Sequence, residues 1–339
     1  MELPEPKKLF ISAIKYNPTH LPSILRLAEI YISNNELLEA KTLLTDSVNA
    51  GTSDPKIFYL VSKVFFLQEQ WLDAQVNIEK SLSGDATSVA SLELAIRIYE
   101  KLEDDYQCIK YLEKLTVENP QAEDYFSLSK LLKSEEHFER KVFYLEEAIH
   151  LESKNKIFLT TLLNTYKDSL KYPFLKLNKD VRDKGKRIIE QLTIIGLDET
   201  SLTECFSFLL EANLNEEIVH LYQLIGSLNK KIFCNDNLFL LAQSYFNAEQ
   251  FEESISILQQ IQDINQNELY QLYLLRSLHF SSKDYKPNKK NINQLKQLYL
   301  GKKQYHIDCF LLRNDFLSAK KALHDLKRFE SVFTDFSEH

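Results

Sequence analysis

The chain repeats its apolar pattern at a fixed interval, and this repeat restricts its fold more than any other feature of the sequence. A segment that begins at Leu21 superposes on two later segments when 34 residues are added at each step. The matching positions are apolar or small throughout: Ile24, Tyr31, Ala40 and Leu44, then Phe58, Phe65, Ala74 and Ile78, then Leu92, Tyr99, Cys108 and Leu112. A unit of this length cannot bury its own apolar face, so successive units must stack.

Each unit has the pattern of a helix, a short polar turn and a second helix. In the first unit the apolar run Leu27–Tyr31 precedes the polar turn 33–36, and Ala40 follows on the second helix. A small residue belongs where two helices approach closely, and large aromatic and aliphatic residues fill the space between helix pairs. We therefore expect an all-α fold, an α-solenoid of stacked antiparallel helix pairs.

Composition supports a helical protein and excludes several classes of function. Only 6 Gly and 8 Pro are present, too few for the turns of a large all-β protein. The 41 Lys and Arg are outnumbered by 49 Asp and Glu, so bulk attraction to nucleic acid or anionic lipid is not expected. Two basic stretches, 176–187 and 283–303, coincide with an insertion and a linker and are interpreted as solvated loops.

The repeat resembles the tetratricopeptide repeat (TPR), in which a Leu-Gly or Leu-Ala pair, a Tyr, a small Ala on the second helix and a closing Pro recur. Leu27, Ala28, Tyr31 and Ala40 carry the resemblance, and Pro120 lies where the closing proline belongs. The resemblance implies a right-handed TPR-like superhelix. It also implies that the first helices line a concave groove holding an extended peptide or a partner helix.

Four regions follow from the strength of the pattern. They are an N-terminal capping helix at 1–20, regular repeats at 21–154 starting near 21, 55, 89 and 122, degenerate repeats at 155–234 with an insertion near 170–180, and repeats with C-terminal capping helices at 235–339. In the sixth unit Glu217 takes the place of the usual Ala in this alignment. The seventh unit, around Leu241–Tyr245, is regular again.

Motifs that carry catalytic chemistry are absent from the sequence. It contains no glycine-rich phosphate-binding loop, no Gly-x-Ser-x-Gly and no His-Glu-x-x-His. The four cysteines, Cys108, Cys205, Cys234 and Cys309, are far apart, which argues against a disulfide framework or a zinc knuckle. We expect no enzymatic activity, no metal and no cofactor.

The N-terminus lacks the basic and apolar pattern of a secretion signal, and no stretch approaches about 18 consecutive apolar residues. These features favour a cytoplasmic protein that does not insert into a membrane.

A candidate binding site lies on the first helices. The residue that follows the Ala28 position is a cation in three consecutive units, namely Lys63, Arg97 and Lys130, which we call the basic stripe. Asn164 occupies this position in the fifth unit. Aromatic residues lie one helical turn away: Tyr59, Phe66 and Phe126. The stripe is interpreted as gripping an acidic peptide or a C-terminal carboxylate. A solvated face neutralised by Glu93 and Glu100 is the alternative.

In later units the same face is apolar, with Phe206, Leu209, Leu210, Phe239 and Phe246. These residues either receive an amphipathic helix or form ordinary packing between repeats.

The function indicated is that of a scaffold or adaptor that binds a protein or peptide in the concave groove. A structural subunit that uses its convex face or its ends is the alternative. An RNA-binding repeat or an enzyme-associated repeat domain is less favoured. The partner and the oligomeric state are left open.

Overall fold

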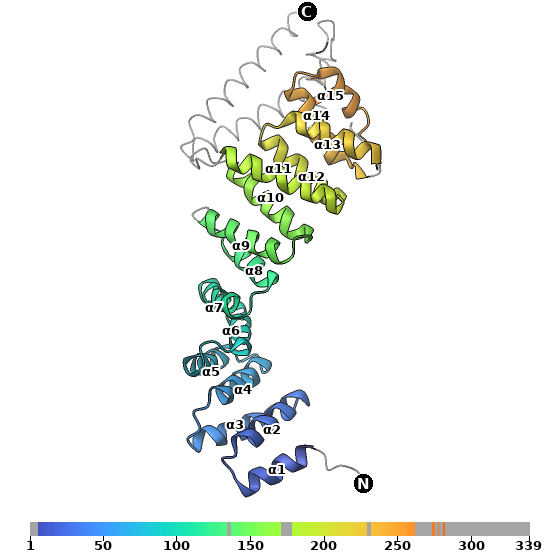
Figure 1. The fold of residues 1–339 in the computed structure, drawn as a ribbon. Coiled ribbons are helices and arrows are strands. Elements are labelled where there is room, and N and C mark those ends of the chain that lie inside the picture. Colours follow the sequence, from blue (N-terminus) through green and yellow to red (C-terminus); the bar gives the residue numbers. More distant parts are fainter. Residues whose placement is uncertain are drawn as a thin grey trace, which may run out of the picture. The chain divides into compact units, whose positions relative to one another are not determined.

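The computed structural model describes residues 6–133, 137–170, 178–228 and 232–261, together with residues 273, 274, 277 and 281. In these residues the chain forms fifteen α-helices and no strand (Figure 1). They are α1 (Pro6–Tyr16), α2 (Leu21–Ser33), α3 (Leu37–Asn49), α4 (Pro55–Leu67), α5 (Trp71–Gly84), α6 (Val89–Lys101), α7 (Asp105–Glu118), α8 (Ala122–Leu131), α9 (Phe138–Leu151), α10 (Lys156–Leu170), α11 (Asn178–Ile195), α12 (Glu199–Glu211), α13 (Asn215–Leu228), α14 (Asn235–Asn247) and α15 (Phe251–Leu258). The all-α solenoid class expected from the sequence is confirmed.

The chain divides into two compact units, Met1–Leu162 and Leu163–His339. In the N-terminal unit the first helices α2, α4, α6 and α8 begin at 21, 55, 89 and 122, the residues at which the repeats were expected to start. Each packs against the second helix of its own pair, and the second helices α3, α5 and α7 pack against the first helix of the next pair. The first helices α2, α4 and α6 also contact one another in sequence, so they form a continuous layer.

The turn inside each helix pair has one recurring geometry. Its middle residue has a positive φ of 55° to 62° in five pairs: Asn35, Glu69, Glu103, Asn213 and Glu249. The amide of the next residue bonds back to the first helix, for example Gln70 N to Phe65 O at 2.9 Å and Gln250 N to Tyr245 O at 2.9 Å. This six-to-one hydrogen bond with a left-handed residue is the Schellman ending of a helix. It reverses the chain within three residues.

Small residues lie where the two helices of a pair approach most closely. Ser62 Oγ donates to Ala74 O at 2.7 Å, and Ser254 Oγ donates to Ala242 O at 2.9 Å. These pairs occupy equivalent positions in the second and seventh repeats. Ala40 and Ala74 have no exposed surface, and the Cys108 thiol fills the same position in the third repeat. A larger residue there would separate the helices, because interiors are close-packed.

The position of the turn in the sixth repeat changes how this repeat aligns with the others. In four other pairs the small residue lies five positions after the positive-φ residue, as Ala40 follows Asn35 and Ser254 follows Glu249. From Asn213 this count leads to Ile218, which is fully buried, and not to Glu217. Glu217 is half-buried and pairs with Lys186 on α11. The prediction that Glu217 occupies the position of the small residue was wrong, because the sequence of α12 does not show at which residue the turn begins.

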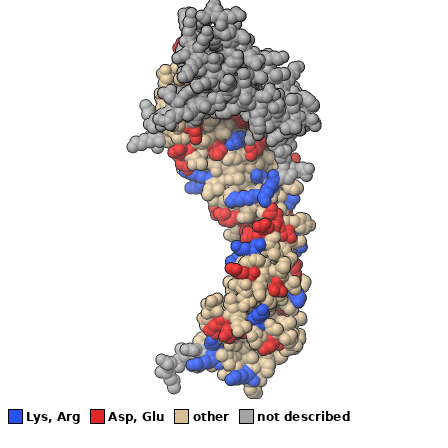
Figure 2. All heavy atoms as spheres, turned by 180° about the vertical axis from the view of Figure 1, so that it is seen from behind, with Lys and Arg blue, Asp and Glu red and all other residues tan. Residues whose placement is uncertain are grey.

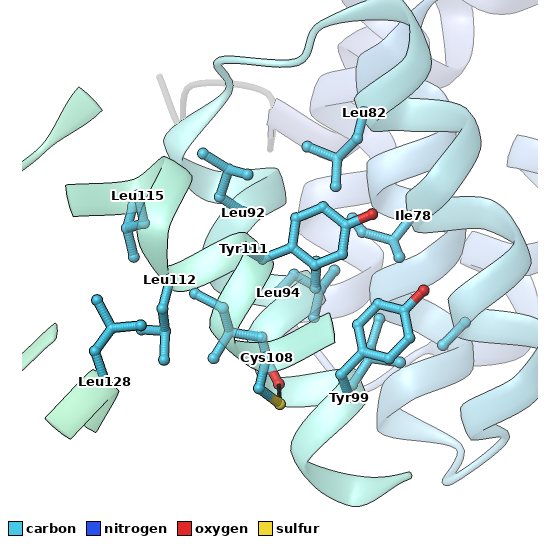
Figure 3. Packing of buried hydrophobic residues seen from close by; sticks show 14 of the residues in the cluster. Ile78, Leu82, Leu92, Leu94, Tyr99, Cys108, Tyr111, Leu112, Leu115 and Leu128 are labelled. Atoms are coloured by element: carbon cyan, nitrogen blue, oxygen red, sulfur yellow. Dashed lines mark hydrogen bonds between the residues drawn. The ribbon is translucent and has the colours of Figure 1, made fainter. Parts of the chain in front are cut away.

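The apolar core of the N-terminal unit continues from one pair to the next. One cluster joins residues of α4 through α9, and Figure 3 shows Tyr99 and Tyr111 beside Ile78 and Cys108 near Leu112. A second cluster joins α2, α3 and α4. Since each cluster draws on neighbouring pairs, burial of apolar surface holds successive pairs together and contributes most of the stability.

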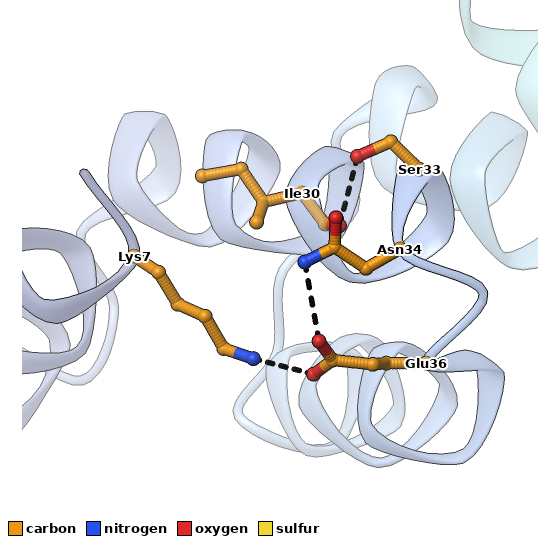
Figure 4. Close-up of polar contacts among 5 residues, drawn as sticks. All are labelled: Lys7, Ile30, Ser33, Asn34 and Glu36. Carbon is orange, nitrogen blue, oxygen red and sulfur yellow. Dashed lines mark hydrogen bonds and ion pairs between the residues drawn. The ribbon is translucent and has the colours of Figure 1, made fainter. Parts of the chain in front are cut away.

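Helix α1 covers the outer side of the first pair. None of its residues is fully buried, but Ile14 packs against the α2–α4 cluster. Lys7 Nζ donates to Glu36 Oε2 at 2.5 Å, and Asn34 Nδ2 donates to the other oxygen of Glu36 at 3.1 Å (Figure 4). The hydrogen bond from Lys7 lowers the pKa of Glu36. These contacts attach α1 to the first turn.

Several predicted features lie outside the described residues. They are residues 171–177 of the insertion, the basic stretch 283–303 and the C-terminal capping helices. Among the helices that the structure describes, none has both the length and the apolar character needed to cross a membrane.

Candidate functional site

The basic stripe lies on the first helices α4, α6 and α8 of the N-terminal unit. Each cation directly follows a buried residue of its helix, so it emerges at the edge of the packed face; these buried residues are Ser62, Ile96 and Ser129. Lys63 is half-buried, whereas Arg97 and Lys130 are exposed. Equivalent positions on stacked pairs place the three side chains on the same face of successive first helices.

Each cation of the stripe lies over an aromatic ring. The ring centroid is 6.0 Å from Lys63 Nζ for Tyr59, 4.9 Å from Arg97 Cζ for Phe66, and 4.0 Å from Lys130 Nζ for Phe126. The Phe66 contact joins α4 to α6. A cation over a ring gains about 0.5–1 kcal/mol at exposed sites, and its remaining N–H donors are available to a ligand.

None of the three cations forms an ion pair within the described part of the chain. Elsewhere in this unit ion pairs do form, such as Arg140 with Glu113 at 2.5 Å and Lys133 with Asp105 at 2.8 Å. The positive charges of the stripe are therefore not neutralised by an ion pair with any described residue.

The aromatic residues beside the stripe do not all reach the surface. Phe66 is 9% exposed and Phe126 is 5% exposed, and Phe126 packs against Phe158 with ring centroids 4.7 Å apart. Two of the predicted aromatic residues, Phe66 and Phe126, are therefore buried. Phe66 and Phe126 lie beneath the cations and hold them in place. Tyr59 is only half-buried and keeps part of its ring exposed.

Acidic groups border the stripe without pairing with it. Burial raises the pKa of Tyr59; Glu93 and Glu29 raise it further, while Arg97 lowers it. Burial also raises the pKa of Asp124, with Glu93 as the next cause. Glu93 thus lies close to both Tyr59 and Asp124. The face consequently carries both signs of charge, and Figure 2 shows both signs interspersed on the side of the molecule that it presents.

The predicted residues of the C-terminal unit have a different environment. Asn164 on α10 is half-buried, and its Oδ1 is buried without a hydrogen-bond donor among the described residues. Phe239 is 7% exposed, with its ring 5.2 Å from that of Tyr273. The half-buried ring of Phe246 contacts Phe251 and Tyr273. These contacts favour packing between repeats over a free apolar groove at Phe239 and Phe246.

The described residues form no metal-binding cluster, and two of their cysteines have a raised pKa. Within the described residues no group of three or more His, Cys, Asp or Glu could hold a metal ion. Burial raises the pKa of the Cys108 thiol to about 11 and that of Cys205 to about 12, which makes both poor nucleophiles at neutral pH.

Comparison with known proteins agrees with this architecture. The sequence model of the tetratricopeptide repeat family matches residues 236–266. No curated protein matches the chain. The fold is similar to that in a structure of Naa15/Naa10 bound to HypK-THB, with a TM-score of 0.56, 12% identity, 82% of this chain covered and 41% of that chain.

Other similar structures are smaller TPR proteins. YrrB, described as a TPR protein with an unusual peptide-binding site, has a TM-score of 0.44 and 18% identity over 57% of this chain and 94% of that chain. A tetratricopeptide repeat protein from Parabacteroides merdae has a TM-score of 0.39 and 11% identity over 76% and 98%. Residues 236–266 thus match the tetratricopeptide repeat family, and the described residues have a helical-repeat fold.

Proposed function

We propose that this protein is a non-catalytic scaffold that binds a peptide or helix of a partner protein along its first-helix face. The proposal rests on one observation, namely how the cations of the basic stripe are positioned and that their charges are not paired. Three cations at equivalent positions each lie over a ring, and none forms an ion pair within the described residues. Such groups are held in place for an anionic ligand before it arrives, which reduces the entropy lost on binding.

The ligand that suits this face is an extended acidic segment or one with a free C-terminal carboxylate. Arg97 offers a planar fork that binds a carboxylate through two hydrogen bonds, while Lys63 and Lys130 act as point charges. Glu93 on α6 and Asp124 on α8 lie on helices that carry the stripe, and they would disfavour a ligand of uniform negative charge. The segment is therefore expected to alternate acidic with neutral or basic side chains.

The fold supports a protein partner, because a TPR-like solenoid exposes a long surface built from many equivalent helices. The similar Naa15/Naa10 structure contains such a fold in a complex with another protein. A cytoplasmic location belongs to the same proposal, since the described cysteines Cys108, Cys205 and Cys234 are all free.

The test is an affinity capture from native lysate, read by mass spectrometry, with two matched variants. Lys63→Glu, Arg97→Glu and Lys130→Glu together reverse the stripe. Lys15→Glu, Lys101→Glu and Lys154→Glu together change the net charge equally at exposed positions elsewhere in the same unit.

The proposal expects a partner that binds the wild type and the second variant but not the first. Equal capture by all three proteins would reject the first-helix face as the binding site. Circular dichroism of each variant checks that the helices remain folded.

A further inference from the structure

Arg97 differs from the other two cations of the basic stripe in the partners that its own helix offers. Glu93 lies four residues before Arg97 on α6 and Glu100 lies three residues after it, the spacings at which charged side chains pair on a helix. All three side chains are exposed, yet Arg97 forms an ion pair with neither carboxylate. Lys63 and Lys130, by contrast, have no acidic residue three or four positions away on either side. Arg97 therefore leaves two available partners unused.

A ring of the neighbouring first helix holds the Arg97 side chain instead. Arg97 Cζ lies 4.9 Å from the ring centroid of Phe66 on α4, and α4 packs directly against α6. Phe66 is itself buried, and its ring contacts that of Trp71 on α5 with the centroids 5.1 Å apart. Because packing fixes this ring, it is a rigid support for the guanidinium where α4 and α6 meet.

A guanidinium supported in this way is suited to a planar anion. Its N–H donors are arranged as a fork that matches the two oxygens of a carboxylate. An ammonium at the same place could not donate two parallel hydrogen bonds, so Arg97 and a lysine would not be equivalent. Arginine is also among the residues that most often carry the binding energy of an interface.

The two carboxylates of α6 restrict what can bind beside Arg97. The side chains of Glu93 and Glu100 make no hydrogen bond or ion pair with any described residue, so their charges are not neutralised by a contact. They would repel a second anion next to the one that Arg97 binds. A phosphate group carries a charge of about −1.5 to −2, whereas a carboxylate carries one negative charge and is planar. A single carboxylate is therefore favoured over a phosphate.

We propose that Arg97 is the residue that selects the ligand, and that Phe66 is its positioning residue. The ring of Phe66 keeps the guanidinium away from Glu93 and Glu100. The ligand places one carboxylate, from an Asp or Glu side chain or from a chain end, where α4 and α6 meet. It carries no second negative charge directly beside that group. This inference rests on the ligand-binding role proposed for the first-helix face.

Four synthetic peptides of twelve residues are the probes, and fluorescence anisotropy measures their binding to the full chain. The acidic probe repeats Glu-Pro-Ala four times and ends in an amide. Two Gln probes replace every Glu by Gln, one with a free C-terminal carboxylate and one with an amide. The fourth probe replaces every Glu of the acidic probe by phosphoserine.

The first variant keeps the charge of Arg97 but removes its fork. Arg97→Lys should bind the acidic probe about tenfold more weakly than the wild type, as expected for the loss of one charge-assisted hydrogen bond. Arg26→Lys on α2 is the matched control, because Arg26 already pairs with Glu29 at 2.9 Å, and it should retain wild-type affinity. Equal affinity of the wild type and Arg97→Lys, or tighter binding of the phosphoserine probe than of the acidic probe, would overturn the role of Arg97.

The second variant tests the support. Phe66→Leu removes the ring but keeps an apolar side chain, so Arg97 should turn towards the carboxylates of its own helix. Binding of the acidic probe should fall about tenfold, and Glu93→Gln with Glu100→Gln should restore it. The same two Gln substitutions in the wild type measure the gain that comes from lower negative charge alone. An equal gain in both backgrounds would overturn the positioning role, whereas a loss of packing would not be rescued at all.

The stripe variant, with Lys63, Arg97 and Lys130 changed to Glu, separates this inference from the proposed function. If the stripe variant binds the acidic probe as the wild type does, or if the wild type binds no probe, the first-helix face is not the binding site and both proposals fail. If the stripe variant loses binding but Arg97→Lys does not, only the role of Arg97 fails. Binding of the free-carboxylate Gln probe and not of its amide would assign the carboxylate to a chain end. Binding of the acidic probe alone would assign it to a side chain, and both of these outcomes support the inference.

Discussion

Glu79 Oε1 accepts hydrogen bonds from the hydroxyls of Tyr111 and Tyr99, each at 2.5 Å. The contact joins α5 to the next pair along the chain, and an equivalent one follows a repeat later, where Tyr144 donates to Glu113 Oε1 at 2.5 Å. Glu113 lies 34 residues after Glu79. A carboxylate of one second helix thus binds the tyrosine of the next, so neighbouring repeats are held by polar contacts as well as by apolar packing.

Removing the Tyr111 hydroxyl should weaken the unit. A hydrogen bond to a charged group contributes about 1.5–3 kcal/mol, so Tyr111→Phe should lower the free energy of unfolding by about that amount in urea titrations. Tyr106→Phe is the control, because that side chain is exposed and its hydroxyl has no partner. Equal effects of the two substitutions would remove the structural role assigned to Glu79. With Glu79→Gln already present, Tyr111→Phe should have a smaller effect.

Stability should fall in alkaline solution. Burial, together with the hydrogen bond to Glu79, raises the pKa of Tyr99 to about 12. An unfolded tyrosine loses its proton near the ordinary pKa of 10.0, while the folded one keeps it, so the unfolded state binds fewer protons above that pH. This contribution is fully present below pH 10 and is lost as the pH rises towards 12. Unfolding midpoints of wild type and Tyr99→Phe should converge over that range; parallel curves would contradict the assignment.

A glycine at the helix-pair turn should stabilise the protein. Glu249 has a φ of 61°, which costs an L-residue about 1–2 kcal/mol. Glu249→Gly removes this strain but adds about 0.4–1 kcal/mol of unfolded-state entropy. We expect a net gain of about 0.5–1 kcal/mol, from those two ranges, and a higher melting temperature. Glu249→Ala keeps the Cβ atom and should give no gain; if it gave the same gain, the turn strain would not be the cause.

Two helical glycines should respond oppositely to alanine. A Cβ atom at Gly185 would lie 2.1 Å from Phe208 Cζ, whereas one at Gly226 would meet nothing within 4 Å. Overpacking costs about 1–3 kcal/mol, so Gly185→Ala should destabilise the C-terminal unit. Gly226→Ala should stabilise it by about 0.5–1 kcal/mol, because alanine is the better helix former. Both are measured by thermal unfolding, and a stabilising Gly185→Ala would show that α11 and α12 do not approach this closely.

The cysteines should react with thiol reagents in a fixed order. Cys234 is partly exposed, whereas Cys108 and Cys205 are buried with a raised pKa. In a Cys309→Ser background at neutral pH, iodoacetamide should modify Cys234 first and the other two only after the protein unfolds. Peptide mapping by mass spectrometry follows each site, and early labelling of Cys108 would contradict the close pairing of α6 and α7.

The 34-residue interval determined the helix pairs and the starts of the first repeats, because local helical propensity and the position of small residues are written in each unit separately. It also placed the cations of the basic stripe on equivalent helices. The sixth repeat shows the limit: without a small residue to mark the close approach, only the Asn213 turn identified Ile218.

Tertiary structure alone decided how deeply each side chain lies and what it meets in the next repeat. Phe66 and Phe126 lie beneath the stripe cations, Glu79 meets two tyrosines, and Leu38, Leu72 and Tyr106 remain exposed although their interval was visible in the sequence. Helical periodicity specifies the face of a helix on which a residue lies. How deeply that face is buried depends on how neighbouring helix pairs pack. This packing is determined by contacts between repeats and not by the sequence of any single repeat.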